Sequence, residues 1–291
     1  MNDLSSTLAA RPALGYATVV VLGLAIGSFL NVVIHRVPEM LRRRWFSECS
    51  ALMAESQPEP DQAERYDLLH PPSTCPHCGH RIRPWENIPL LSFALLRGRC
   101  SACRRRISLR YPAVEALTAL LSLVVLWRLG WSPQMLAGLV LTWTLVVLSF
   151  IDLDTQLLPD AITLPLLWAG LLVNLRGLYV PLEDAVIGAA AGYLILWSVY
   201  QLFRLATGKE GMGFGDFKLL AALGAWLGWQ ALPVIIVLSA GVGALSGILL
   251  MLIGRLQRTH PIPYGPFLAA AGWLALLWGP ELTRAWLGMV R

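Results

Sequence analysis

Apolar runs close to the length of a bilayer crossing recur along this 291-residue chain, and they limit its fold more than any other feature. A transmembrane helix needs about 20 predominantly apolar residues. Hydrophobic residues make up 56% of the chain and charged residues 14%, which argues against a water-soluble globular enzyme. We expect an all-α polytopic membrane protein with about eight transmembrane helices, at residues 14–34, 112–129, 133–151, 161–174, 182–205, 219–228, 232–253 and 266–287.

Charge divides the chain into three predicted parts. Residues 35–111 hold 13 of the 23 Lys and Arg and 8 of the 18 Asp and Glu, and the rest of the chain carries equal numbers of both. We predict a first transmembrane helix within residues 1–34, retained because no small-residue cleavage site follows it. A basic insert at 35–111 and a multi-helix membrane domain at 112–291 follow.

The distribution of Lys and Arg predicts an orientation. If the insert is cytoplasmic, alternating spans leave 18 Lys and Arg on the cytoplasmic side and five on the other. Cytoplasmic loops carry such an excess of positive charge. Basic clusters on a membrane protein more often meet anionic lipid than nucleic acid, so we predict membrane lipid and no nucleic acid as a partner.

Two CxxC pairs lie within the insert. Cys75 and Cys78 form the first pair, and Cys100 and Cys103 form the second after 21 intervening residues. Two such pairs can place four thiolates around one tetrahedral zinc ion, and four protein ligands leave no open position for a catalytic water. The sequence therefore predicts a structural zinc site.

The insert also contains His77, His80 and Cys49, whose side chains are of types that can bind a metal ion. His77 and His80 lie inside or next to the first pair, but four thiolates already fill a tetrahedral site, so we expect neither to be a ligand. Cys49 is far from both pairs and is predicted to be a free thiol.

Two carboxylates lie at the ends of predicted transmembrane helices, where burying an ionised group costs free energy. Asp152 lies at the end of the third predicted span, and Asp216 at the start of the sixth. Two such carboxylates can form an aspartic-protease dyad, in which like charges at close range force the pair to share one proton. The ionised member then activates water, and the protonated member polarises the scissile carbonyl.

Each acid also has a structural interpretation. Asp154 can be a solvated residue or a support for Asp152, and Asp160 follows a proline in the position of a helix N-cap. Asp216 and Lys218 are two residues apart and would not face each other on a helix. Glycines before Asp216 are expected to supply unusual backbone angles and close approach to an extended substrate.

The residues Gly213-Phe-Gly215-Asp216 have the GxGD form of intramembrane aspartic proteases. Together with Asp152-Leu-Asp154 and Leu158-Pro159-Asp160, they resemble the type IV prepilin peptidase family. Further segments similar to that family are residues 27–38, 85–91, 96–100 and 110–115.

This resemblance implies a bifunctional enzyme of the bacterial inner membrane. It would cleave the basic leader of type IV prepilins and pseudopilins after a Gly on the cytoplasmic side, with Asp152 and Asp216 as catalytic residues. It would then N-methylate the new N-terminus with S-adenosylmethionine, an activity typical of members with two CxxC pairs. Asp154 and Asp160 are local alternatives to Asp152. Residues that bind S-adenosylmethionine are unknown, with Glu86, Asn87 and Gly98 as candidates by neighbourhood alone.

Three other functions remain open from the sequence. A peptidase without methylation would keep the dyad only. An ion-coupled transporter would use Asp152 and Asp216 as proton or cation sites and would carry an inverted repeat, which we do not find. A non-catalytic assembly scaffold would tolerate the loss of both carboxylates.

Overall fold

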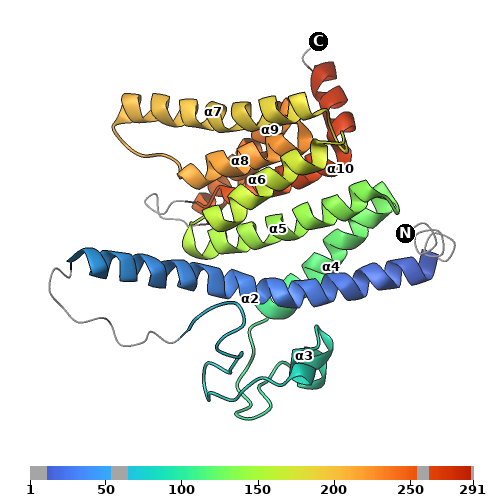
Figure 1. Cartoon of the computed structure of the whole chain (residues 1–291), viewed down its shortest axis with the longest axis vertical. Coiled ribbons are helices and arrows are strands. Elements are labelled where there is room, and N and C mark those ends of the chain that lie inside the picture. The colour runs from blue at the N-terminus through green and yellow to red at the C-terminus, as the bar shows by residue number, and fades with distance from the viewer. Residues whose placement is uncertain (1–11, 54–64, 254–261, 290–291) are drawn as a thin grey trace. The chain divides into compact units, whose positions relative to one another are not determined.

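A computed structural model of the chain describes residues 12–53, 65–253 and 262–289, and these ranges are mainly helical (Figure 1). The only β pairing within them is two isolated antiparallel bridges, Thr74–Arg81 and Arg99–Arg106. The predicted all-α class is confirmed. The helices are α2 (Pro12–Met53), η1 (Pro84–Asn87), α3 (Leu91–Leu95), α4 (Arg110–Leu129), α5 (Pro133–Thr155), α6 (Asp160–Asn174), α7 (Leu182–Thr207), α8 (Phe214–Leu227), η2 (Trp229–Ala231), α9 (Leu232–Leu252) and α10 (Gly265–Met289).

Each predicted span coincides with one long helix, although the ends differ. Within the described ranges, five segments are long and apolar enough to cross a membrane: Pro12–Leu52, Arg110–Leu129, Pro133–Thr155, Leu182–Thr207 and Trp229–Leu252. A sixth apolar helix, Asp160–Asn174, is shorter than a full crossing. These apolar helices identify the chain as a membrane protein. The count of eight crossings stays a prediction.

The first helix is longer than its apolar run predicts. It continues past Ile34 into the insert and ends at Met53, with Pro38 inside it. Glu39 forms ion pairs with Arg42 and Arg43, at i,i+3 and i,i+4, which stabilise a helix after its apolar residues end. Residues 54–64, which follow α2, lie outside the described ranges.

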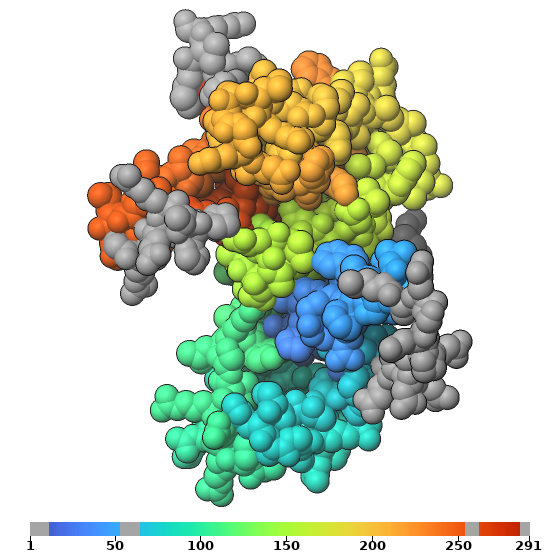
Figure 2. Space-filling model, turned by 90° about the vertical axis from the view of Figure 1, so that its left-hand side faces the viewer, coloured from blue at the N-terminus to red at the C-terminus, as the bar shows by residue number. Residues whose placement is uncertain are grey.

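The chain divides into two compact units, Met1–Val124 and Val125–Arg291. In the first unit, α2 and α4 cross at two glycines four residues apart. A Cβ at Gly23 would lie 2.7 Å from the Cα of Ala119, and one at Gly27 would lie 2.7 Å from the Cα of Glu115. This small-residue contact lets two membrane helices approach closely. The insert lies against α2 (cyan beside blue in Figure 2).

In the second unit, α8 is enclosed by its neighbours. It packs against α7, α6 and α10, and α10 also contacts α9 and α5 (Figure 1). A Cβ at Gly224 would lie 2.1 Å from the carbonyl oxygen of Gly188, so α7 and α8 approach as closely as their backbones allow. Every α8 residue from Leu219 to Trp226 is buried.

Asn174 fixes the far end of α8. This buried residue, the last of α6, donates from Nδ2 to the carbonyl oxygens of Ala225 and Trp226 at 2.9 and 3.0 Å. The last carbonyls of a helix lack partners within it, so these bonds cap α8. The Trp226 indole N–H also donates to the carbonyl of Leu166 at 2.8 Å. Together these contacts lock α6 to α8.

Candidate active site and metal centre

The four cysteines of the two CxxC pairs converge in the insert. The sulfur atoms of Cys75, Cys78, Cys100 and Cys103 all lie within 4.8 Å of one another, with Cys75 and Cys103 at 3.9 Å and Cys78 and Cys100 at 4.0 Å. Four thiolates about 2.3 Å from one zinc ion are about 3.8 Å apart in a tetrahedron. The group therefore fits a tetrahedral metal ion with little adjustment.

The two pairs adopt the same backbone turn. The N–H of Cys75 donates to the carbonyl of the residue five positions on, and its own carbonyl accepts from Gly79, both at 2.9 Å. Cys100 repeats both bonds, with Arg104 in the place of Gly79. Gly79 has a φ of 69° and Arg104 a φ of 57°, so a left-handed residue ends each turn. The CxxC spacing thus encodes one turn used twice.

Backbone N–H groups point at three of the sulfur atoms, and that of His80 points at Cys78, whose pKa burial and the neighbouring thiols nevertheless raise to about 11. The backbone N–H groups of His77 and Cys78 lower the pKa of Cys75 to about 7. Those of Cys103 and Ala102 act in the same way on Cys100 and lower its pKa. A thiolate is the form that binds metal, so these donors favour a loaded site.

The other candidate ligands of the insert lie outside the cysteine group, as the sequence predicted. His80 contacts Glu86 at 3.3 Å and Ser101 at 3.2 Å and so bridges the two turns. His77 Nδ1 lies 3.3 Å from a guanidinium nitrogen of Arg105, which donates a hydrogen bond to it. Cys49 is an exposed residue of α2.

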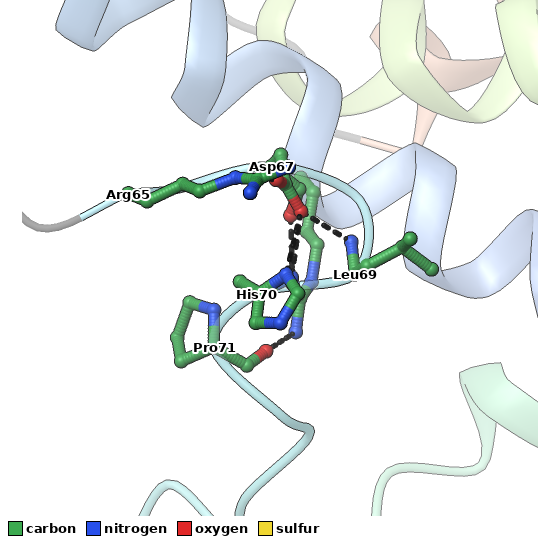
Figure 3. Close-up of polar contacts among 6 residues, drawn as sticks. Arg65, Asp67, Leu69, His70 and Pro71 are labelled. Carbon is green, nitrogen blue, oxygen red and sulfur yellow. Dashed lines mark hydrogen bonds and ion pairs between the residues drawn. The ribbon is translucent and has the colours of Figure 1, made fainter.

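The loop before the first cysteine is folded around Asp67 (Figure 3). Its Oδ1 accepts the backbone N–H groups of Leu69 and His70 at 2.7 Å each, and Arg65 donates to Oδ2 at 2.6 Å. The backbone N–H groups of His70 and Leu69 make the largest contributions, and together with the Arg65 guanidinium they lower the pKa of Asp67 to about 2. The carbonyl of Asp67 accepts from Arg36 of α2 at 2.8 Å, which ties the loop to that helix.

The two predicted catalytic acids meet in the second unit. Asp152 lies one turn before the end of α5, and Asp216 lies in the first turn of α8. They are 5% and 8% exposed. They are close enough for their charges to interact.

The start of α10 completes the surroundings of the pair. The backbone N–H of Gly265 donates to Asp152 Oδ2 at 2.9 Å. The neighbouring Tyr264 lies near enough to Asp216 for their charges to interact, and its hydroxyl is 2.6 Å from the hydroxyl of Ser239 in α9. Segments more than a hundred residues apart in sequence thus surround the two carboxylates.

Leu158, in the α5–α6 loop, packs between two glycines of this site. A Cβ at Gly215 would lie 2.7 Å from the Cβ of Leu158, and one at Gly265 would lie 3.3 Å from its Cδ1. Gly213, with φ −80°, and Gly215 both lie outside the left-handed region. The prediction that these glycines supply unusual backbone angles is therefore wrong, because close packing explains Gly215.

The remaining acids have other partners. Asp160 is the first residue of α6, the N-cap position belongs to Pro159, and no side chain caps it. The predicted N-cap role of Asp160 is wrong, because its carboxylate binds Lys218 Nζ at 2.6 and 2.7 Å. This ion pair joins the first turns of α6 and α8. Asp154 is an exposed residue of α5.

Residues noted near the insert have structural partners. Asn31 donates to the carbonyl of Tyr111 at 3.1 Å, an interhelical bond between α2 and α4. Gly98 has a φ of 66°, and a Cβ there would lie 2.8 Å from the Phe93 ring. Glu86 accepts the backbone N–H of Arg83 at 2.9 Å.

Two family models match this chain, one over its N-terminal part and one over its C-terminal part. Residues 21–129 match the family described as bacterial peptidase A24 N-terminal domain, and residues 139–248 match the type IV leader peptidase family. A prepilin leader peptidase/N-methyltransferase of Aeromonas salmonicida is 59% identical over 281 residues, 96% of each chain. The chain belongs to the type IV leader peptidase family.

Other relatives in this family have the same name. The prepilin leader peptidase/N-methyltransferase of Pseudomonas aeruginosa is 54% identical over 280 residues, 96% of each chain. That of Burkholderia pseudomallei strain K96243 is 49% identical over 263 residues, covering 90% of this chain and 85% of the relative. No solved structure matches this chain.

Sequence reasoning missed two contacts that shape the candidate active site of this leader peptidase family member. The Gly265 donor lies between Tyr264 and Pro266, and a glycine before a proline at the start of an apolar run was the available signal. The pairing of Lys218 with Asp160 joins residues 58 positions apart, and helical spacing carries no information about such a pair.

Proposed function

We propose that this protein is a prepilin leader peptidase and N-methyltransferase whose proteolytic residues are Asp152 and Asp216. The observation that carries the proposal is that these two carboxylates, one on α5 and one on α8, are both buried and lie near enough for their charges to interact. Family membership supports it, since relatives 49–59% identical bear that name. The same relatives argue against an ion-coupled transporter.

The chemistry follows from one proton shared between two carboxylates. The ionised carboxylate takes a proton from water as the water attacks the scissile carbonyl. The protonated carboxylate polarises that carbonyl and later supplies the proton that the leaving amine needs. The N–H of Gly265, 2.9 Å from Asp152 Oδ2, holds one carboxylate in place for this exchange.

The substrates we propose are type IV prepilins and pseudopilins. An apolar helix in the bilayer and a basic leader in the cytoplasm would place their junction at the membrane surface, and cleavage after a Gly would remove the leader. We place the protein in the bacterial inner membrane with the insert and both Asp on the cytoplasmic side, as the excess of Lys and Arg favours.

Methyl transfer is the proposed second activity, with S-adenosylmethionine as methyl donor. We propose zinc as the structural ion of the four cysteines, since an all-thiolate group of this spacing suits it. The proposed parts remain a first transmembrane segment within 1–34, a zinc-bound insert at 35–111 and a peptidase domain at 112–291, with the helix of the first part continuing to Met53.

Intact-mass analysis of a synthetic prepilin tests this assignment. Wild type should remove the leader and, with S-adenosylmethionine, add a methyl group. Asp152→Asn and Asp216→Asn should each abolish cleavage, because an amide can neither ionise nor share the proton. Asp154→Asn is the matched control on the same helix and should cleave normally. Cleavage by either of the first two variants would remove the dyad assignment.

A further inference from the structure

The insert is fastened at two points, to Glu115 of α4 and to Arg36 of α2, and a third bond joins these two helices near the predicted membrane boundary. Glu115 of α4, 8% exposed, accepts the backbone N–H of Leu90 at 2.9 Å. Asn31 of α2 binds the carbonyl at the start of α4, and Arg36 of α2 binds the carbonyls of Asp67 and Pro71 at 2.8 and 2.5 Å.

These contacts fix the depth of α3. Glu115 is five residues into α4, which corresponds to about 8 Å along the helix axis. Leu90 is bound there, and α3 begins at the next residue, Leu91. The short helix α3 therefore begins next to the point where Glu115 holds Leu90, and Figure 1 shows it beyond the N-terminal end of α4, at the level expected of a bilayer's interfacial layer.

One edge of the insert exposes large apolar side chains. Phe93 points inward, since a Cβ at Gly98 would touch its ring. Leu91 and Leu95 lie one turn apart on another face of α3 and are 52% and 74% exposed. Trp85 at 62% and Ile88 at 44% precede them in the sequence, and we call these four exposed side chains the insert edge: Trp85, Ile88, Leu91 and Leu95.

The stretch of sequence that holds the insert edge is strongly basic. Between residues 75 and 110 the sequence holds eight arginines and one carboxylate, Glu86. That carboxylate is occupied by the Arg83 N–H and by His80. Arg83, Arg97 and Arg99 are exposed, and Arg83 lies over the Trp85 ring at 5.5 Å.

We propose that the insert edge docks in the membrane interface, with its apolar side chains between lipid headgroups and its arginines on anionic phospholipid. Trp and Arg next to aliphatic side chains are the composition of interfacial anchors. The charge selects the partner: a basic surface attracts anionic lipid, whereas it repels a basic leader peptide. This proposal does not depend on the dyad assignment.

Hydrogen exchange on the full chain in lipid nanodiscs tests the proposal. In phosphatidylglycerol, peptides covering residues 84–96 should exchange about tenfold more slowly than in phosphatidylcholine. Leu91→Ser with Leu95→Ser should remove this protection. Leu69→Ser, at a residue 75% exposed on the Asp67 loop, is the matched control and should leave protection at residues 84–96 unchanged.

Two further measurements keep the result interpretable. Metal content equal to wild type shows that the double Ser variant retains a folded insert, and unchanged leader cleavage separates this result from the peptidase assignment. Protection equal in the two lipids, or undiminished in the double variant, would overturn the proposal. Protection that arises only when a prepilin is added would overturn it as well, and would indicate a protein partner.

Discussion

Gly265→Ala is the substitution that most directly tests how the dyad is positioned. A Cβ there would lie 2.7 Å from Asp152 Oδ2, whereas ordinary contact begins at 3.4 Å. Either the carboxylate or the start of α10 must therefore move by roughly 0.7 Å. A displacement of about 1 Å in an active site can cost about 10²-fold in rate, so we expect cleavage to slow roughly 10- to 100-fold.

Single-turnover cleavage of a synthetic prepilin measures this loss directly. Gly241→Ala in α9 is the control, because no atom lies within 4 Å of a Cβ at that position. It should cleave at the wild-type rate. Thermal unfolding in detergent reports whether Gly265→Ala remains folded. A folded Gly265→Ala protein that cleaves within twofold of wild type would refute the positioning argument.

Three other predictions concern the same unit and the metal centre. Gly215→Ala should slow cleavage far more than Gly213→Ala. A Cβ at Gly215 would lie 2.7 Å from the Cβ of Leu158, whereas a Cβ at Gly213 would lie 4.0 Å from its nearest atom. Equal cleavage rates in the two variants would contradict the packing explanation. Lys218→Met and Asp160→Asn should each slow cleavage about threefold to tenfold. The double variant should cleave no more slowly than either single variant, because both substitutions remove the same ion pair. If the two rate losses multiply in the double variant, the residues have independent roles. Cys75→Ser should lose zinc and lower methylation while leader cleavage survives, as metal analysis and intact mass would record; full zinc retention would argue against the four-thiolate group.

Local sequence pattern predicted the elements of this fold well. Apolar run length located each long helix, because a membrane helix must be apolar over a set length. Two CxxC pairs located the metal group, since two sulfurs on one tight turn need only local backbone geometry. The end of α2 was missed because ion pairs such as Glu39–Arg42 continue a helix that apolar length alone would end at residue 34.

Tertiary partners were predicted less completely. That Asp152 and Asp216 would lie near each other was predicted from chemistry, since two carboxylates at membrane depth need a function, and their catalytic role stays a prediction. The Gly265 N–H and the Lys218–Asp160 pair were not anticipated, because neither hydropathy nor helical period states which helix ends meet. The role of Gly215 was misjudged for the same reason: its constraint comes from Leu158 in another segment.

Because other helices enclose α8, its surroundings are protein side chains and not lipid. Its 14 residues extend about 21 Å, less than the roughly 30 Å of hydrocarbon in a bilayer. A lipid-facing helix of that length would have to tilt or thin the membrane. The neighbours of α8 are α6, α7 and α10, so its fit is set by side-chain volume and not by membrane thickness. The polar end that carries Asp216 can therefore lie deeper than a lipid-exposed helix of full length would allow.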